Sequence, residues 1–165
     1  MNGPWRRGYV ALGSNLGNRE AALESALVEL DATPGVRVDA VSRFHRTAPV
    51  GGPAGQGEFV NAVARVRTRL AAEDLLAALQ AVEARHGRDR AREVRNGPRT
   101  LDLDLLLLEG ETRDTEQLQL PHPRMEDRLF VLEPLEDLDP ALILPRCGRS
   151  VRDQVAALRA PEAVL

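Results

Sequence analysis

The sequence has 165 residues, 43% of them hydrophobic, and a formal net charge of −3. This length suits one packed domain, and the hydrophobic fraction excludes a wholly disordered chain. There is no run of roughly 18 apolar residues to span a membrane, no apolar segment of a signal peptide, and only one cysteine, which excludes a disulfide framework. We therefore expect a single domain over residues 1–165, located in the cytoplasm.

Hydrophobic patterning predicts an α+β domain. A buried apolar run or period-two alternation predicts four strands: residues 8–13, 36–40, 59–66 and 100–108. A period of 3.6 predicts one helix between Asn18, its N-cap, and Pro34, and a second helix over residues 71–86. The order strand, helix, strand, strand, helix, strand predicts a ferredoxin-like antiparallel sheet with helices on one face.

Two segments are predicted to form loops, and the C-terminal third is predicted to form an extension of the domain. Residues 51–57 are too rich in Gly and Pro for regular structure, and residues 88–99 are rich in Arg. The C-terminal extension is expected to contain short strands, a turn at residues 121–123 and a helix near residues 150–159.

Asp102 and Asp104 are the candidate metal ligands. Residues two apart in a strand point the same way, so both carboxylates are expected on one face, with Leu103 on the other. Two like charges side by side raise a pKa unless a cation lies between them, and Mg²⁺ commonly takes one or two carboxylates plus substrate phosphates. The alternative is an ordinary amphipathic strand with a solvated polar face.

The segment before these aspartates is strongly basic. Residues 88–99 contain five arginines and two acidic residues, which gives a local charge of +3. The sequence has no lysine, so phosphate recognition must come from guanidinium groups. A guanidinium cluster beside metal-binding carboxylates suits a polyphosphate. A solvated loop or a nucleic-acid surface is the alternative, but this stretch lacks the aromatic residues that nucleic-acid binding favours.

Three further side chains could bind a ligand. Phe59 and Asn61 share one face of their predicted strand, which we expect to be the face of the aspartates, and an aromatic ring beside an amide suits a flat heterocycle. Phe59 could equally be a core residue. His122, between two prolines, could donate to a phosphate or make a structural hydrogen bond. The glycine-containing turn at residues 13–17 does not match a Walker A motif.

Five segments together resemble the 6-hydroxymethyl-7,8-dihydropterin pyrophosphokinase family of the folate pathway. They are VALGSNLG (residues 10–17), RTAP (residues 46–49), FVNA (residues 59–62), GPRTLDLD (residues 97–104) and LPHPRM (residues 120–125). They follow the order and spacing of that family.

The resemblance implies a reaction and a set of site residues. The reaction is transfer of pyrophosphate from ATP to the hydroxymethyl group of the reduced pterin, with AMP as product. Asp102 and Asp104 would hold two Mg²⁺ ions, and Arg88 and Arg99 would act with them in catalysis. The positions implied to bind ATP are Glu83, Arg88, Arg99, Leu105, His122 and Arg128. The positions implied to bind pterin are Thr47, Val50, Phe59, Asn61 and Phe130, with the two phenylalanines stacking on the ring.

The resemblance also implies that loops at residues 50–58 and 88–99 close over the substrates. The expected partners of the protein are ATP and the reduced pterin, with no nucleic acid and no membrane. The protein is expected to be a monomer. The sequence departs from the family pattern at Phe59, Asn96 and Ala48, where relatives often have Tyr, Trp and Pro. The resemblance assigns no roles to Arg90, Arg92 and Arg95.

Two other functions are compatible with part of the sequence. A nucleotidyltransferase also combines a Gly-Ser turn with paired aspartates, but its two elements lie close in sequence, whereas Ser14 and Asp102 are far apart. An RNA-binding or regulatory module of the same fold is the second alternative. An RNA-binding sheet displays aromatic residues, and these are only 3% of this chain.

Overall fold

The computed structural model describes residues 3–48, 57–87 and 100–160. Its main sheet is antiparallel, with the strand order β2-β4-β1-β5, and β3 also pairs with β4. The strands are β1 (Arg6–Ser14), β2 (Val36–Val41), β3 (His45–Thr47), β4 (Phe59–Thr68) and β5 (Asp102–Leu108). The predicted α+β order is confirmed, with β3 as one short addition. Within the described residues, no helix combines the length and apolarity needed to cross a membrane.

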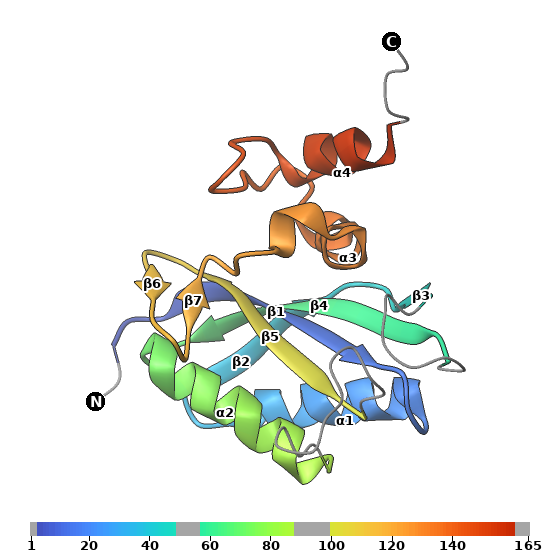
Figure 1. The fold of residues 1–165 in the computed structure, drawn as a ribbon. Helices are drawn as coiled ribbons and strands as arrows, with labels where there is room; N and C mark the ends of the chain where they lie inside the picture. The colour runs from blue at the N-terminus through green and yellow to red at the C-terminus, as the bar shows by residue number, and fades with distance from the viewer. Residues whose placement is uncertain (1–2, 49–56, 88–99, 161–165) are drawn as a thin grey trace.

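Two helices pack against one face of this sheet, as predicted (Figure 1). Helix α1 (Arg19–Asp31) begins after Asn18, whose side-chain oxygen accepts a hydrogen bond from the Ala21 N–H at 3.2 Å. This bond confirms the predicted N-cap. Helix α2 (Ala72–Arg85) has no side-chain cap, but Glu73 and Asp74 lie in its first turn, where the helix dipole favours negative charge.

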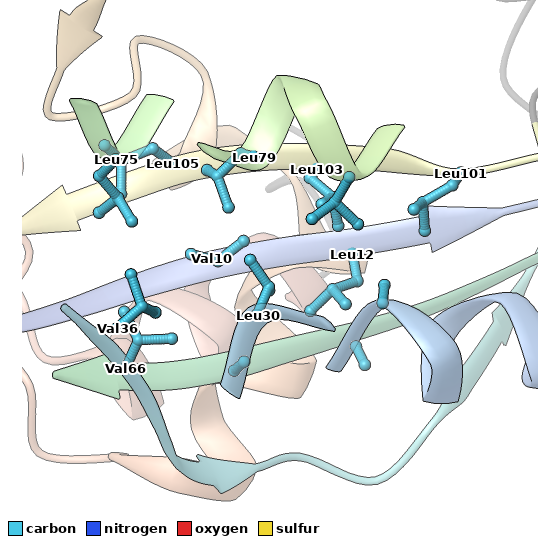
Figure 2. Close-up of a cluster of buried hydrophobic side chains, with 14 of the residues drawn as sticks. Val10, Leu12, Leu30, Val36, Val66, Leu75, Leu79, Leu101, Leu103 and Leu105 are labelled. Carbon is cyan, nitrogen blue, oxygen red and sulfur yellow. The ribbon is translucent and has the colours of Figure 1, made fainter. Parts of the chain in front are cut away.

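The first hydrophobic core lies between the sheet and these two helices (Figure 2). Leu12 of β1 and Leu103 of β5 point into it, and they meet Leu30 of α1 and Leu79 of α2. In β4, Val60 and the residues two, four and six positions later are all buried in this core. The opposite face of the central strands is therefore left for other contacts.

A C-terminal extension covers part of the opposite face (Figure 1). Its elements are β6 (Arg113–Asp114), β7 (Gln119–Leu120), the 3₁₀ turn η1 (Met125–Asp127), α3 (Leu129–Leu138) and α4 (Val151–Arg159). A second core joins Tyr9 and Val63 of the sheet to Met125 and to Leu132 of α3. Helix α4 lies where a helix was predicted, and its N-cap is Ser150, whereas α3 was not predicted.

Polar contacts fix this extension to the sheet. The Tyr9 hydroxyl donates to the carboxylate of Asp139, directly after α3, and Arg65 pairs with the same carboxylate. Burial and then the hydrogen bond to Asp139 raise the pKa of Tyr9 to about 12, so Tyr9 stays a protonated donor at neutral pH. Buried Glu126 accepts hydrogen bonds from the backbone N–H groups of Arg146 and Cys147. The C-terminal end of α3 is thereby held against the sheet, and Glu126 joins the turn before α3 to the segment before α4.

Candidate active site

The two predicted metal ligands lie side by side on the edge strand β5. Asp102 and Asp104 are both partly exposed, whereas Leu101, Leu103 and Leu105 are at most 3% exposed. The alternation confirms that the carboxylates share one face, the face opposite α1 and α2.

One cross-strand row joins the aspartates to the predicted pterin residues. Asn61 of β4 lies opposite Gly13 of β1, and Gly13 lies opposite Asp102 of β5. Directly paired residues share a face, so the Asn61 amide and the Asp102 carboxylate stand on the same surface, about 10 Å apart at two strand spacings. The predicted common face is confirmed.

Gly13 keeps the space between these two side chains open. A Cβ at this position would lie 3.2 Å from the Asn61 side-chain oxygen and 3.9 Å from Cδ1 of Phe59. Only glycine avoids that close approach without moving the amide. In the next row Ala11 lies opposite Asp104, so the strand between the two groups carries a bare backbone and one methyl group. The sequence shows Gly13 as part of a glycine-containing turn, but only the strand register shows that it lies between Asn61 and Asp102.

Thr47 orients the Asn61 amide. The Asn61 Nδ2 group donates to Thr47 Oγ1 at 2.7 Å, and Thr47 of β3 is paired directly with Phe59 of β4. Asn61 is 7% exposed and Phe59 is half-buried. The structure therefore brings together three of the five predicted pterin residues on one patch of the sheet.

His122 and Arg128 lie near the aspartates. The His122 backbone N–H donates to the carbonyl of Leu106 at 2.9 Å, which attaches this segment to β5. Burial lowers the pKa of His122, the positive charge of Arg128 lowers it further, and Asp102 opposes them. His122 Nδ1 accepts a hydrogen bond from the Arg124 N–H at 3.2 Å, so the neutral ring carries its proton on Nε2.

Phe130 lies in the first turn of α3 and is half-buried. The Arg128 guanidinium lies 5.4 Å from the centre of its ring, a cation–π distance. The predicted pterin residue of α3 and one predicted nucleotide residue are therefore in contact.

Glu83 and Leu105 lie on the helix side of the sheet. Glu83 is 2% exposed and accepts a hydrogen bond from the Leu103 N–H at 2.7 Å. The Leu105 side chain is buried in the first core. A nucleotide contact by Leu105 therefore has to come from its backbone at the edge of β5, where its N–H points the same way as that of Leu103. Their predicted nucleotide roles stay predictions.

Three predicted residues lie outside the described part of the chain: Val50, Arg88 and Arg99. The same holds for Asn96, for Arg90, Arg92 and Arg95, and for most of the two loops expected to close over the substrates. Their roles stay predictions.

A separate cavity of about 410 Å³ lies beside the paired strands β6 and β7. Its lining is formed by Thr112, Arg113, Asp114, Gln119, Leu120, Pro121 and Arg146. Arg113 is already paired with Glu73 and Glu111, and none of the predicted site residues lines this cavity. The sheet surface around Gly13 remains the better candidate site.

The donor set suits magnesium. Among residues 3–48, 57–87 and 100–160, no group of three or more His, Cys, Asp or Glu side chains could hold a metal. A pair of carboxylates is nevertheless what Mg²⁺ needs when substrate phosphates and water complete its octahedron. Asp102 and Asp104 are partly exposed and lie beside Gly13 and Ala11, so bulky neighbours on β1 do not cover them.

Comparison with known proteins finds a matching family and several similar proteins. Residues 9–140 match the family model described as 7,8-dihydro-6-hydroxymethylpterin-pyrophosphokinase. The 2-amino-4-hydroxy-6-hydroxymethyldihydropteridine pyrophosphokinase of Pseudomonas aeruginosa is 47% identical over 152 residues, covering 92% of this chain and 91% of that protein. The Bacillus subtilis protein of the same name is 47% identical over 130 residues, covering 79% and 76% of the two chains.

Solved structures share the fold. Wild-type Plasmodium falciparum HPPK-DHPS with pteroate superposes with a TM-score of 0.73 at 11% identity, over 95% of this chain. An HPPK-DHPS in complex with substrates gives a TM-score of 0.69 at 11% identity, over 93% of this chain. In both cases this chain spans 43% of the longer protein. At this identity the likeness concerns the fold alone.

Proposed function

The chain belongs to the 7,8-dihydro-6-hydroxymethylpterin-pyrophosphokinase family, and from this premise we propose that it transfers pyrophosphate from ATP to 6-hydroxymethyl-7,8-dihydropterin. The protein is thus a pyrophosphokinase of folate biosynthesis, and AMP is its second product. The observation that supports the proposal is the row Asn61–Gly13–Asp102, which has an amide at one end and a carboxylate at the other on the same face of the sheet.

The pterin lies at the β3–β4 end of this row. The Asn61 amide, oriented by Thr47, offers a donor and an acceptor for the polar edge of the ring. Phe59 stacks on one side of the ring and Phe130 of α3 on the other. The resemblance also implies a pterin contact by Val50, which lies outside the described residues. Stacking and amide hydrogen bonds together favour a flat, polar heterocycle over a purely apolar ligand.

The triphosphate of ATP lies at the β5 end. Arg128 and the Nε2–H of His122 donate to phosphate oxygens, and Arg88 and Arg99 act with them. The lowered pKa of His122 is compatible with this role, since the neutral ring still carries the donor proton on Nε2. Guanidinium groups suit phosphate because they offer paired, planar donors.

Asp102 and Asp104 hold magnesium, and we expect two ions. When bound, the metal lowers the pKa of the pterin hydroxyl and neutralises charge on the phosphates, which supplies the main chemical assistance. The backbone of β5, paired with β1, holds both carboxylates on one face of the sheet.

The reaction is an in-line displacement at the β-phosphorus of ATP. The hydroxymethyl oxygen of the pterin forms a bond to this phosphorus while the bond to the oxygen shared with the α-phosphate breaks. AMP leaves with that oxygen, and the hydroxyl proton passes to solvent. Water has to be excluded from the bound substrates, because ATP hydrolysis would compete with transfer. The resemblance assigns this role to residues 50–58 and 88–99, most of which lie outside the described part of the chain.

We also propose that residues 1–165 act as one catalytic domain, because both cores share the same sheet. The monomeric state and cytoplasmic location expected from the sequence stay predictions.

The experiment is to incubate the protein with ATP, Mg²⁺ and the reduced pterin and to identify the nucleotide product. Pterin-dependent AMP supports the proposal. Release of free pyrophosphate points instead to nucleotidyl transfer, and ADP points to transfer of a single phosphoryl group.

A further inference from the structure

Strand β3 is too short to hold its own position. It has three residues, His45–Thr47, and within the described part of the chain it pairs only with β4. Typical strands have about five or six residues, so a three-residue edge strand depends on side-chain contacts for its placement. Thr47 of this strand accepts the hydrogen bond that orients Asn61. The geometry of the proposed pterin pocket therefore depends on what holds β3.

Asp137 of α3 holds the start of this strand. Its carboxylate oxygens lie 2.7 Å from His45 Nε2, 3.2 Å from the Arg43 backbone N, and 3.0 and 3.3 Å from the Arg43 guanidinium nitrogens. The Asp137 side chain is 15% exposed. Burial opposes its ionisation, but the hydrogen bonds from Arg43 and His45 outweigh burial and lower its pKa.

The same helix carries Phe130. Residues seven apart lie on one side of a helix and about 10 Å apart along it, so Phe130 and Asp137 lie along the same side of α3. In the proposed pocket, Thr47, Asn61 and Phe59 form the sheet wall and Phe130 forms the helix wall. Asp137 thus connects the two walls through His45, whose strand partner is Asn61.

We propose that Asp137 is a positioning residue for the pterin: by holding His45 it fixes β3, and thereby Thr47 and Asn61, relative to Phe130. This inference rests on the proposed function and assigns a role to a contact between residues 92 positions apart. A positioning role predicts a change in the KM for pterin alone, whereas a general loss of stability would change the KM values for both pterin and ATP.

The test compares Asp137→Ala, the milder Asp137→Asn, His45→Ala and the double variant Asp137→Ala/His45→Ala. The matched control is Glu133→Ala, which removes an ion pair between α3 and Arg159 of α4 without touching β3. For each variant, kcat and the KM values for pterin and ATP are measured, and the folded state is checked by circular dichroism. Asp137→Asn keeps the side-chain shape if Asp137→Ala does not fold.

A charge-assisted hydrogen bond of this kind predicts a rise of about tenfold in the KM for pterin in Asp137→Ala. Asp137→Asn gives a smaller rise. The KM for ATP and kcat change by less than about twofold, as do all three constants of Glu133→Ala. The double variant resembles Asp137→Ala, because that substitution already removes the contact with His45.

Equal increases in the KM values for pterin and ATP, an unchanged KM for pterin, or additive effects of Asp137→Ala and His45→Ala would each overturn the proposal. Failure of the proposed function is recognised separately, since the unaltered protein would then form no pterin-dependent AMP.

Discussion

The Glu83 carboxylate accepts a hydrogen bond from the backbone N–H of Leu103 at 2.7 Å. Leu103 lies between Asp102 and Asp104 on an edge strand, so helix α2 holds the backbone that carries both carboxylates. An edge strand otherwise leaves such N–H groups without a strand partner. The bond therefore links the first core to the strand that carries both carboxylates.

Replacing Glu83 tests this link. Glu83→Met leaves the Leu103 N–H buried without this acceptor and is expected to lower the free energy of unfolding by about 1–3 kcal/mol. Glu83→Gln retains an acceptor oxygen and should lose less. Urea unfolding of both variants measures the difference, and equal losses would mean that the hydrogen bond to Leu103 contributes little.

The metal assignment predicts loss of activity without loss of fold. Asp102→Asn and Asp104→Asn each remove a negative charge from a partly exposed face and are expected to lower kcat by roughly 100-fold or more. The unfolding midpoint should change little, because neither side chain lies in the two cores. Isothermal titration with Mg²⁺ and an ATP analogue provides a second measurement. Near-normal turnover at ordinary Mg²⁺ would rule out the assignment.

Gly13 predicts a steric effect on pterin binding. In Gly13→Ala the new methyl group lies 3.2 Å from the Asn61 side-chain oxygen, so the amide has to shift. We expect the KM for pterin to rise about tenfold, which corresponds to about 1.4 kcal/mol. The control is Gly3→Ala, whose Cβ meets only the Arg69 carbonyl at 4.0 Å. Unchanged pterin binding in Gly13→Ala would show that the clearance is not needed.

Phe59 predicts a difference between the two substrates. Phe59→Ala removes the stacking surface of the proposed pocket, whereas Phe59→Tyr restores it and adds the hydroxyl that relatives often have. Loss of stacking is expected to weaken pterin binding by about tenfold, with little change for ATP. Equilibrium binding of each substrate measures the effect. Equal losses for pterin and ATP would contradict stacking.

His122 predicts a pH dependence of stability. Its pKa in the folded protein lies below the ordinary value of 6.5, so below that pH the unfolded chain binds the proton more readily. Stability is therefore lost as the pH falls from 6.5 toward the folded-state pKa. Between pH 6.5 and 5.5 this loss is at most about 1.4 kcal/mol, and it should disappear in His122→Gln. Urea unfolding of both proteins at pH 7.5 and 5.5 tests this, and identical pH dependence would contradict it.

The strand pattern was predictable because period-two alternation in β4 and β5 is strong. It placed Phe59, Asn61, Asp102 and Asp104 on faces that the structure confirms. Register was not predictable, since alternation does not say which residues lie opposite one another. The position of Gly13 between Asn61 and Asp102 therefore required the structure.

Helix α3 and strand β3 were missed for local reasons. Pro134 lies inside α3 and lacks the N–H of a normal helical residue, which weakens the sequence pattern of a helix. Strand β3 has only three residues, too few for alternation to be recognised. The contact between His45 and Asp137 has no local signal, because it joins segments far apart in sequence.

The most direct test of the proposed function is a product analysis with the unaltered protein and Asp102→Asn in parallel. Both are incubated with ATP, Mg²⁺ and 6-hydroxymethyl-7,8-dihydropterin, and the nucleotide and pterin products are identified by mass spectrometry. We predict equal amounts of AMP and pterin diphosphate from the unaltered protein, none without pterin, and almost none from Asp102→Asn. ADP, free pyrophosphate, or no pterin-dependent turnover by the unaltered protein would contradict the proposed function.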